Sequence, residues 1–246
     1  MVADRETPTI QDARVIGERL VQCFPSIEGV LLCGSVARGD ADPWSDIDLV
    51  VIGQDAELTP VRLRGTLADG ADRVSLIYYP TPAFQELYRE RALFIAHLQK
   101  EGLILFDPRN LLKTMLSESF VPKVDVAEGI KSQRARLIPY TDPRRFNNNF
   151  LFCLSHLYSI GKGVVMLGLA KEGILEFNRE AAFRQFSDLH PDLAGETRKI
   201  AQLRPFYRLV TGRRPEPLPF PYQSAGPQMQ EAVRAIETIA QQAEKS

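Results

Sequence analysis

Two aspartates separated by one residue, Asp46 and Asp48, have the spacing that most directly indicates chemistry in this chain. They stand at the start of an apolar segment, 47–52, which has the composition of a buried strand. Side chains at i and i+2 of a strand share a face, so the carboxylates would lie about 6–7 Å apart. Two such carboxylates repel each other unless a cation lies between them. Because Mg²⁺ takes carboxylate oxygens and keeps waters and phosphates as its other ligands, we expect a magnesium site here.

A glycine and a serine, Gly34 and Ser35, follow the preceding apolar segment, 29–33. A glycine after a strand lets the backbone approach a phosphate closely, and backbone N–H groups at the start of a following helix favour anions. Ser35 adds a hydroxyl, and Arg38 adds a positive charge just beyond it. Neither a Walker loop nor a GxGxxG fingerprint is present. The segment therefore predicts phosphate binding by a loop outside these two classes.

The combined segment 34–51, GSVARGDADPWSDIDLVV, resembles the nucleotidyltransferase superfamily of DNA polymerase β. The superfamily pattern is Gly-Ser, a short spacer and then Asp-x-Asp on the next strand, and ten residues here separate Ser35 from Asp46. The segment is closest to the minimal nucleotidyltransferases and to the antibiotic-modifying branch. Its motif is specific for the superfamily but not for a substrate.

This resemblance implies an α+β fold, with a polymerase β-like nucleotidyltransferase domain over 1–108 and a helical domain over 109–246. It implies that Gly34 and Ser35 hold the β- and γ-phosphates of a nucleoside triphosphate, and that Asp46 and Asp48 bind two Mg²⁺ ions. Those ions would activate an acceptor hydroxyl and neutralise the leaving pyrophosphate. The expected reaction is transfer of a nucleoside monophosphate, with AMP from ATP the favoured case, to a hydroxyl of a small molecule, a protein or an RNA.

The sequence departs from the family pattern at the third carboxylate. The superfamily usually places it on a later strand, here 73–79, and the aligned residue is Ser75. Serine is a poor Mg²⁺ ligand and a poor general base. Asp72, three residues earlier, faces the other side of a regular strand but could reach the site if the strand begins only at Val74. Either Asp72 or another acid such as Glu101 replaces the third carboxylate, or the enzyme has lost its base.

The elements that must position these residues alternate between strand and helix in the first half of the chain. Thr9 with Asp12 predicts a capped helix start, and the pairs 59–60 and 81–82 are threonine caps followed by proline. Strands are predicted at 29–33, 47–52, 73–79 and 103–106, and helices at 10–21, 60–68 and 81–101. Strands spaced by helices indicate α/β packing in this half.

After residue 108 the patterns become helical. Helices are predicted at 111–116, 126–137, 145–171, 179–186 and 196–210, with an amphipathic stripe over 229–243. The segment 212–227 contains five prolines and is predicted to be a loop. The segment 150–170 approaches membrane-spanning length, but His156 and Lys162 lie in its middle. A buried core helix is therefore the better interpretation, and we expect no membrane contact.

Charge separates the two halves. Residues 1–108 carry 10 basic and 17 acidic residues, whereas residues 109–246 carry 20 and 14. The acidic half could hold a cation and the basic half could face an anion, or the two halves could simply dock. Lys162 is the preferred triphosphate ligand of the helical half, because a lysine between glycines in an apolar helix needs an anionic partner. Snorkelling to water would explain Lys162 equally well.

Composition excludes several classes of protein. The chain has 246 residues, 44% of them hydrophobic and 25% charged, with a net charge of −1, which excludes a collagen, a coiled-coil rod and a disordered charged tail. Three separated cysteines and a polar N-terminus predict a reduced, cytoplasmic protein. Two rival functions stay open: a catalytically impaired, nucleotide-binding regulatory protein, and a partner-binding module that acts through the helical domain. The acceptor, the nucleotide base and the oligomeric state stay open as well.

Overall fold

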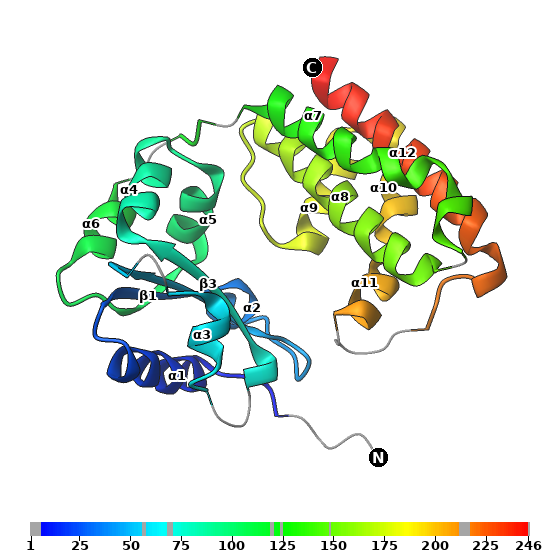
Figure 1. The fold of residues 1–246 in the computed structure, drawn as a ribbon. Helices are drawn as coiled ribbons and strands as arrows, with labels where there is room; N and C mark the ends of the chain where they lie inside the picture. The colour runs from blue at the N-terminus through cyan, green and yellow to red at the C-terminus, as the bar shows by residue number, and fades with distance from the viewer. Residues whose placement is uncertain are drawn as a thin grey trace. The chain divides into compact units, whose positions relative to one another are not determined.

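The computed structural model describes residues 6–55, 58–67, 71–118, 121–123, 125–147, 149–211 and 217–245. The chain divides into two compact units, Met1–Lys123 and Val124–Ser246 (Figure 1). Among the described residues, all strands lie in the first unit. Helix α6 (Leu111–Ser117) packs on β1 (Ile27–Cys33) of the first unit, which places the boundary between compact units after this helix. The division into functional domains at residue 108 stays a prediction.

The first unit is built on one mixed sheet with the strand order β3-β2-β1-β4. Its other strands are β2 (Ile47–Gly53), β3 (Val74–Pro80) and β4 (Leu103–Phe106), so all four predicted strands are confirmed. β1 runs antiparallel to both β2 and β4, whereas β2 and β3 are parallel. The end of β1 therefore meets the starts of β2 and β3 at one end of the sheet. That end carries the predicted site.

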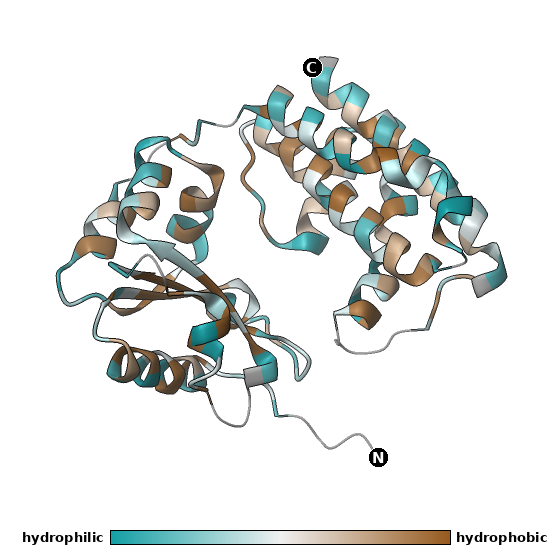
Figure 2. Ribbon diagram, viewed as in Figure 1, coloured by the Kyte–Doolittle hydropathy of each residue, from teal (hydrophilic) through white to brown (hydrophobic). Residues whose placement is uncertain are grey.

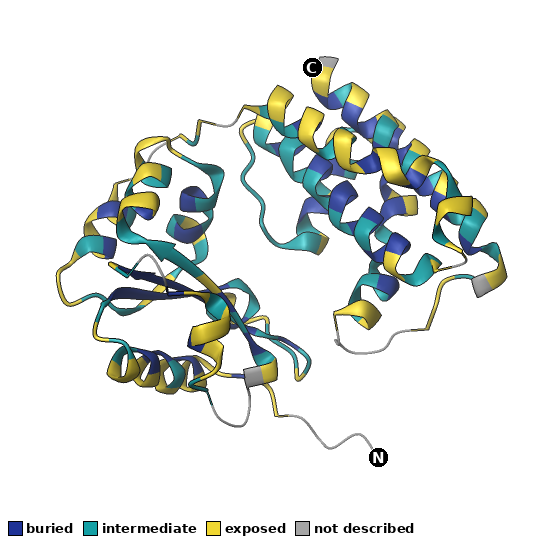
Figure 3. Cartoon of the chain, viewed as in Figure 1, coloured by how far each residue is buried: buried dark blue, intermediate teal, exposed yellow. Residues whose placement is uncertain are grey.

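Helices cover both faces of the sheet. One face packs against α1 (Ile10–Cys23) and α3 (Pro60–Arg64), and the other against α4 (Thr81–Arg89), α5 (Leu93–Glu101) and α6. Side chains of β2 alternate between them: Leu49 and Val51 join the α1 side, and Val50 and Ile52 join the α5 side. β1 and β2, the two central strands, are accordingly hydrophobic and almost entirely buried (Figure 2, Figure 3). By the same alternation, Asp48 belongs to the α5 side.

Local signals explain the starts of α1 and α3. Thr9 and Asp12 form the predicted capping box, in which the Thr9 hydroxyl accepts from the N–H of Asp12 at 3.2 Å. Thr59 caps α3 as predicted. Thr81 does not cap α4, because it is the first residue of the helix and Pro80 holds the N-cap position. The Thr81 hydroxyl donates to the buried carboxylate of Glu28 at 2.6 Å. That bond ties the start of α4 to β1.

The predicted helix over 81–101 is wrong in one respect: it is two helices. α4 ends at Arg89 and α5 begins at Leu93, and between them Arg91 adopts a left-handed backbone with a φ of 52°. Arginine rarely adopts this conformation. Because neither glycine nor proline lies at the break, the sequence does not indicate it. The turn that was expected after Gly34 is the short helix α2 (Gly34–Arg38). α2 lies beside α5.

The second unit is a helical bundle around one apolar helix. Its helices are α7 (Val126–Leu137), α8 (Phe150–Lys171), α9 (Arg179–Leu189), α10 (Ala194–Ala201), α11 (Arg204–Val210) and α12 (Ala225–Lys245). Short 3-10 segments are Ile138–Thr141, Pro143–Phe146, Pro191–Leu193 and Tyr222–Ser224, with Ala71–Arg73 in the first unit. By length and composition α8 is able to cross a membrane, but half of its most apolar stretch is buried by this unit. It contacts α7, α9, α10, α11 and α12, so it is the core helix of the bundle.

Three predicted bounds in this unit need correction. α8 begins at Phe150 rather than at 145, because a 3-10 turn and the left-handed Asn147 (φ 45°) precede it. The helix predicted over 196–210 is split between α10 and α11, with Pro205 in the first turn of α11. α12 begins at Ala225, so the end of the predicted proline loop is helical, which the first turn of a helix tolerates. Residues 212–216 of that loop lie outside the described residues.

Candidate active site

Gly34 lies directly against the carboxylate of Asp48. Gly34 has a φ of +75°, which glycine adopts without strain. A Cβ atom added to Gly34 would clash with Oδ2 of Asp48 and lie 3.2 Å from its Cγ. No side chain fits there while Asp48 keeps its place. The fold therefore brings together the glycine and the second aspartate of the predicted motif. In the sequence, the rest of α2 and the following loop lie between them.

Ser75 takes the neighbouring position across the sheet. In the pairing register, Asp48 lies opposite Cys33 of β1 on one side and opposite Ser75 of β3 on the other. Residues directly opposite each other on adjacent strands lie on the same face. A serine thus stands beside Asp48 where the family pattern has its third carboxylate. Asp72 lies exposed in the 3-10 turn before β3, and the strand does begin at Val74.

A hydrogen-bonded turn holds the connection that leads to Asp46. The carboxylate of Asp42 accepts from the N–H of Trp44 at 2.9 Å and from the hydroxyl of Ser45 at 3.1 Å. Arg73, at the start of β3, donates through Nη2 to the carbonyl oxygen of Pro43 at 3.0 Å. Asp46 follows this turn directly and precedes the first paired residue of β2. The sequence Asp-Pro-x-Ser predicts the turn itself, whereas no sequence pattern predicts the hydrogen bond from Arg73.

Arg38, the predicted phosphate ligand at the end of α2, is held by two carboxylates. Its Nη1 lies 2.7 Å from Oε2 of Glu101, the last residue of α5, and its Nε and Nη2 face Asp40. Nε2 of His97 lies 3.1 Å from the same Oε2 of Glu101. Burial alone would raise the pKa of Glu101, but the hydrogen bonds from His97 and Arg38 lower it below its usual value. Glu101 is therefore an ionised anchor for Arg38.

Cys33, the last residue of β1, is affected by its burial and by the charges nearby. Burial, followed by the negative charges of Asp48 and Glu101, raises the pKa of the Cys33 thiol to about 12. The thiol thus stays protonated at neutral pH, and it lies 3.6 Å from the carbonyl oxygen of Asp48. The positive charge of Arg38 acts in the opposite direction on this pKa.

The residues fit a magnesium ion that shares its coordination with a nucleotide. Within the described ranges, no group of three His, Cys, Asp or Glu side chains is placed to hold a metal. Mg²⁺ in nucleotide sites needs only one or two protein carboxylates, because waters and phosphate oxygens complete its octahedron. Asp46 and Asp48 supply that number, and the glycine at 34 places no side chain over the Asp48 carboxylate. A pair of ions would lack the third carboxylate at Ser75, so the expectation of two ions stays a prediction.

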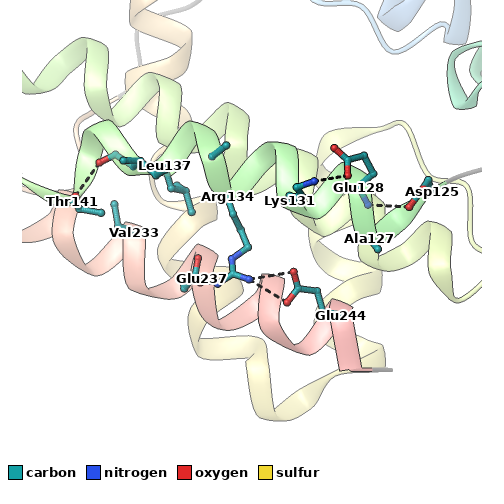
Figure 4. A pocket seen from close by; sticks show the side chains of 12 residues that line it. Asp125, Ala127, Glu128, Lys131, Arg134, Leu137, Thr141, Val233, Glu237 and Glu244 are labelled. Carbon is teal, nitrogen blue, oxygen red and sulfur yellow. Dashed lines mark hydrogen bonds and ion pairs between the residues drawn. The ribbon is translucent and has the colours of Figure 1, made fainter.

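Lys162, the remaining predicted ligand, belongs to the second unit, where it lies half-buried on α8. That unit also has a groove of about 890 Å³ between α7 and α12 (Figure 4). Arg134 in this groove forms ion pairs with Glu237 and Glu244 of α12, and Lys131 pairs with Glu128. Its two basic side chains are thus paired with acidic ones, and the groove includes none of the predicted site residues.

Residues 14–107 match the family model of the nucleotidyltransferase domain. This part of the chain is a nucleotidyltransferase domain. It extends from α1 to the end of β4 and contains Gly34, Ser35, Asp46 and Asp48. The predicted superfamily, the α+β fold class and the enzyme class are therefore confirmed.

Comparison with curated proteins finds no match to the chain. Among solved structures, a nucleotidyltransferase-like protein from Exiguobacterium sibiricum 255-15 is similar at 14% identity, over 94% of this chain and 75% of that one, with a TM-score of 0.41. The crystal structure of a toxin-antitoxin with AMP-PNP is similar at 19% identity, over 51% of this chain and 95% of that one, with a TM-score of 0.33.

The close approach of Gly34 to Asp48 in the nucleotidyltransferase domain can be tested by substitution. Gly34→Ala is expected to weaken binding of a nucleoside triphosphate about tenfold, because the new methyl group displaces the Asp48 carboxylate. The left-handed backbone adds about 1–2 kcal/mol of destabilisation. Calorimetric titration and denaturant unfolding measure the two effects.

Gly39→Ala is the matched control. Gly39 also has a positive φ, of +79°, but nothing lies within 4 Å of an added Cβ. Its alanine variant should lose similar stability and keep nucleotide affinity. Equal loss of affinity in both variants would show that backbone strain alone, rather than contact with Asp48, controls binding.

Proposed function

We propose that the chain is a Mg²⁺-dependent nucleotidyltransferase that moves AMP from ATP to a hydroxyl group of an acceptor. The observation that supports this proposal is the contact between Gly34 and the Asp48 carboxylate within a nucleotidyltransferase domain. A glycine turn that leaves room for phosphate, placed against a magnesium-binding carboxylate, is the arrangement that a metal–triphosphate complex requires. We further propose that the protein works in the cytoplasm.

Each site residue has a definite task in this proposal. The Ser35 hydroxyl donates to a phosphate oxygen at the turn, and Arg38 contributes a charge-assisted bond. Asp46 and Asp48 hold Mg²⁺, which when bound neutralises phosphate charge and the leaving pyrophosphate. The acceptor oxygen attacks the α-phosphorus, and the bond from that phosphorus to the oxygen bridging to the β-phosphate breaks. The acceptor proton passes to Asp72 or to solvent, because Ser75 is not a base at neutral pH.

The acceptor belongs to one of three classes: a small molecule, a protein or an RNA. We keep Lys162 as a proposed ligand of the triphosphate and two Mg²⁺ ions as the proposed metal content. The serine at position 75 favours one alternative, a nucleotide-binding regulatory protein with little turnover. Loss of a base costs about 10²–10⁴-fold in rate and leaves binding intact.

A label-transfer assay tests the proposed function. The purified chain is mixed with each α-labelled nucleoside triphosphate, with Mg²⁺ or Mn²⁺, and with cell extract as a source of acceptors. The Asp46→Ala/Asp48→Ala double variant runs beside it. Label that moves to an acceptor only with intact aspartates supports the transferase and identifies its nucleotide. Binding of a nucleotide without any transfer would favour the regulatory alternative.

A further inference from the structure

We propose that Arg38 is a phosphate-binding arginine whose two carboxylate partners have opposite effects on nucleotide affinity. Glu101 positions the guanidinium, whereas Asp40 occupies the edge of the guanidinium that a phosphate would take. The proposal rests on the nucleotide binding proposed above and assigns a new role to two residues outside the Gly-Ser and Asp-x-Asp motif.

Glu101 has the properties of a fixed anchor. Only 4% of its side chain is exposed, and it is held from two directions by Arg38 Nη1 at 2.7 Å and His97 Nε2 at 3.1 Å. It ends α5, whose residues Ile95 and Leu98 are fully buried against the sheet. Because a rigid helix fixes this carboxylate, Glu101 fixes Nη1 of Arg38 and with it the direction of the guanidinium plane.

Asp40 has the properties of a displaceable partner. Its side chain is 44% exposed, and its two oxygens face Nε and Nη2 of Arg38 at 3.3 and 3.2 Å. This is the bidentate arrangement by which arginine also binds a pair of phosphate oxygens. The N–H of Asp40 donates to the carbonyl oxygen of Ser35 at 3.1 Å, so the chain returns here to the start of α2. Asp40 thus occupies the edge of Arg38 that we assign to a phosphate of the nucleotide.

Charge counting alone makes a different prediction. Glu101→Gln and Asp40→Asn each remove one negative charge beside Arg38, and electrostatics alone would make both variants bind an anionic nucleotide more tightly. If the two carboxylates act by positioning Arg38, the two variants change nucleotide affinity in opposite directions. Loss of the anchor frees Arg38 to turn away, whereas loss of the competitor exposes its bidentate edge.

Calorimetric titration of the full chain with Mg²⁺ and a non-hydrolysable ATP analogue measures these signs. Asp40→Asn is expected to bind the analogue about two- to fivefold more tightly, in line with release of an exposed ion pair. Glu101→Gln is expected to bind about tenfold more weakly, in line with loss of a charge-assisted contact. In a transfer assay KM for the nucleotide should fall in Asp40→Asn and rise in Glu101→Gln.

Two controls separate positioning from folding. Asp192→Asn removes an exposed carboxylate in the second unit without touching Arg38 or its partners, and is expected to keep affinity within about twofold. In an Arg38→Ala background, neither Asp40→Asn nor Glu101→Gln should have any further effect, because both act only through the arginine. Thermal unfolding of each variant confirms that the domain is folded at the temperature of the titration.

Several outcomes would overturn the inference. If both variants changed nucleotide affinity in the same direction, electrostatics alone would explain the result. If Glu101→Gln still changed affinity in the Arg38→Ala background, Glu101 would act on the nucleotide directly. A wild-type chain that binds no nucleotide would overturn this inference and the proposed function together. A chain that binds the analogue with opposite signs in the two variants, but transfers no label, would keep this inference and reject the transferase.

Discussion

An Asp48→Asn variant is expected to lose nucleotidyl transfer by about a thousandfold while keeping its fold. Removal of one preorganised electrostatic contact to the transition state typically costs about 10²–10³ in rate, and Asp48 also holds the metal that orients the triphosphate. Asparagine keeps the size of the side chain, so the contact with Gly34 is preserved. Release of pyrophosphate with saturating Mg²⁺ measures the loss.

The stability of this variant should move in the opposite direction from its activity. Without metal, Asp46 and Asp48 carry like charges on either side of Ile47, the first residue of β2. Neutralising Asp48 therefore relieves repulsion, and thermal unfolding without Mg²⁺ should occur at an equal or higher temperature. Added Mg²⁺ with nucleotide should stabilise the wild type and not the variant.

Asp192→Asn, an exposed substitution in the second unit, serves as the control for handling and purity. It should keep full transfer activity. An Asp48→Asn variant that keeps transfer within tenfold of the wild type would remove Asp48 from the metal site. It would also contradict the proposal that the Asp-x-Asp pair binds the catalytic metal.

Local sequence patterns were sufficient to predict the four strands, but not their order or direction in the sheet. The continuous apolar segment after Asp48 indicates a buried strand, and β2 is buried on both faces. The glycine after β1 indicates a close approach, whereas its partner, Asp48, is identified by the structure. The alignment of Ser75 with the third carboxylate also follows from counting along β3 and agrees with the observed register. These features depend on spacings of a few residues, which a sequence displays directly.

The cluster around Arg38 could not be predicted in the same way. Arg38 and Glu101 are 63 residues apart, and no periodicity relates them. Glu101 reaches Arg38 because the chain breaks at the left-handed Arg91 and begins a new helix, α5. Neither glycine nor proline marks that break. The direction of α5, and with it the environment of Arg38, depends on tertiary packing rather than on a local signal.

Ser75→Asp is expected to raise the rate of transfer about a hundredfold, because it places a carboxylate beside Asp48 where the chain has only a hydroxyl. A general base typically contributes about 10²–10⁴-fold, and a carboxylate also adds a metal ligand. The variant has a distinct signature in stability. Three neighbouring carboxylates repel one another without metal, so unfolding should occur at a lower temperature than in the wild type and recover with Mg²⁺.

Ser75→Asn separates charge from size in this experiment. It fills the same space without a negative charge, and it should neither accelerate transfer nor acquire a stronger dependence on Mg²⁺. If Ser75→Asp is no faster than Ser75→Asn, a carboxylate at position 75 does not act as the base. Asp72, in the turn before β3, and Glu101 are then the residues to replace. A Ser75→Asp variant that gains rate would instead show that the wild-type site binds its nucleotide as a nucleotidyltransferase does but works without the third carboxylate.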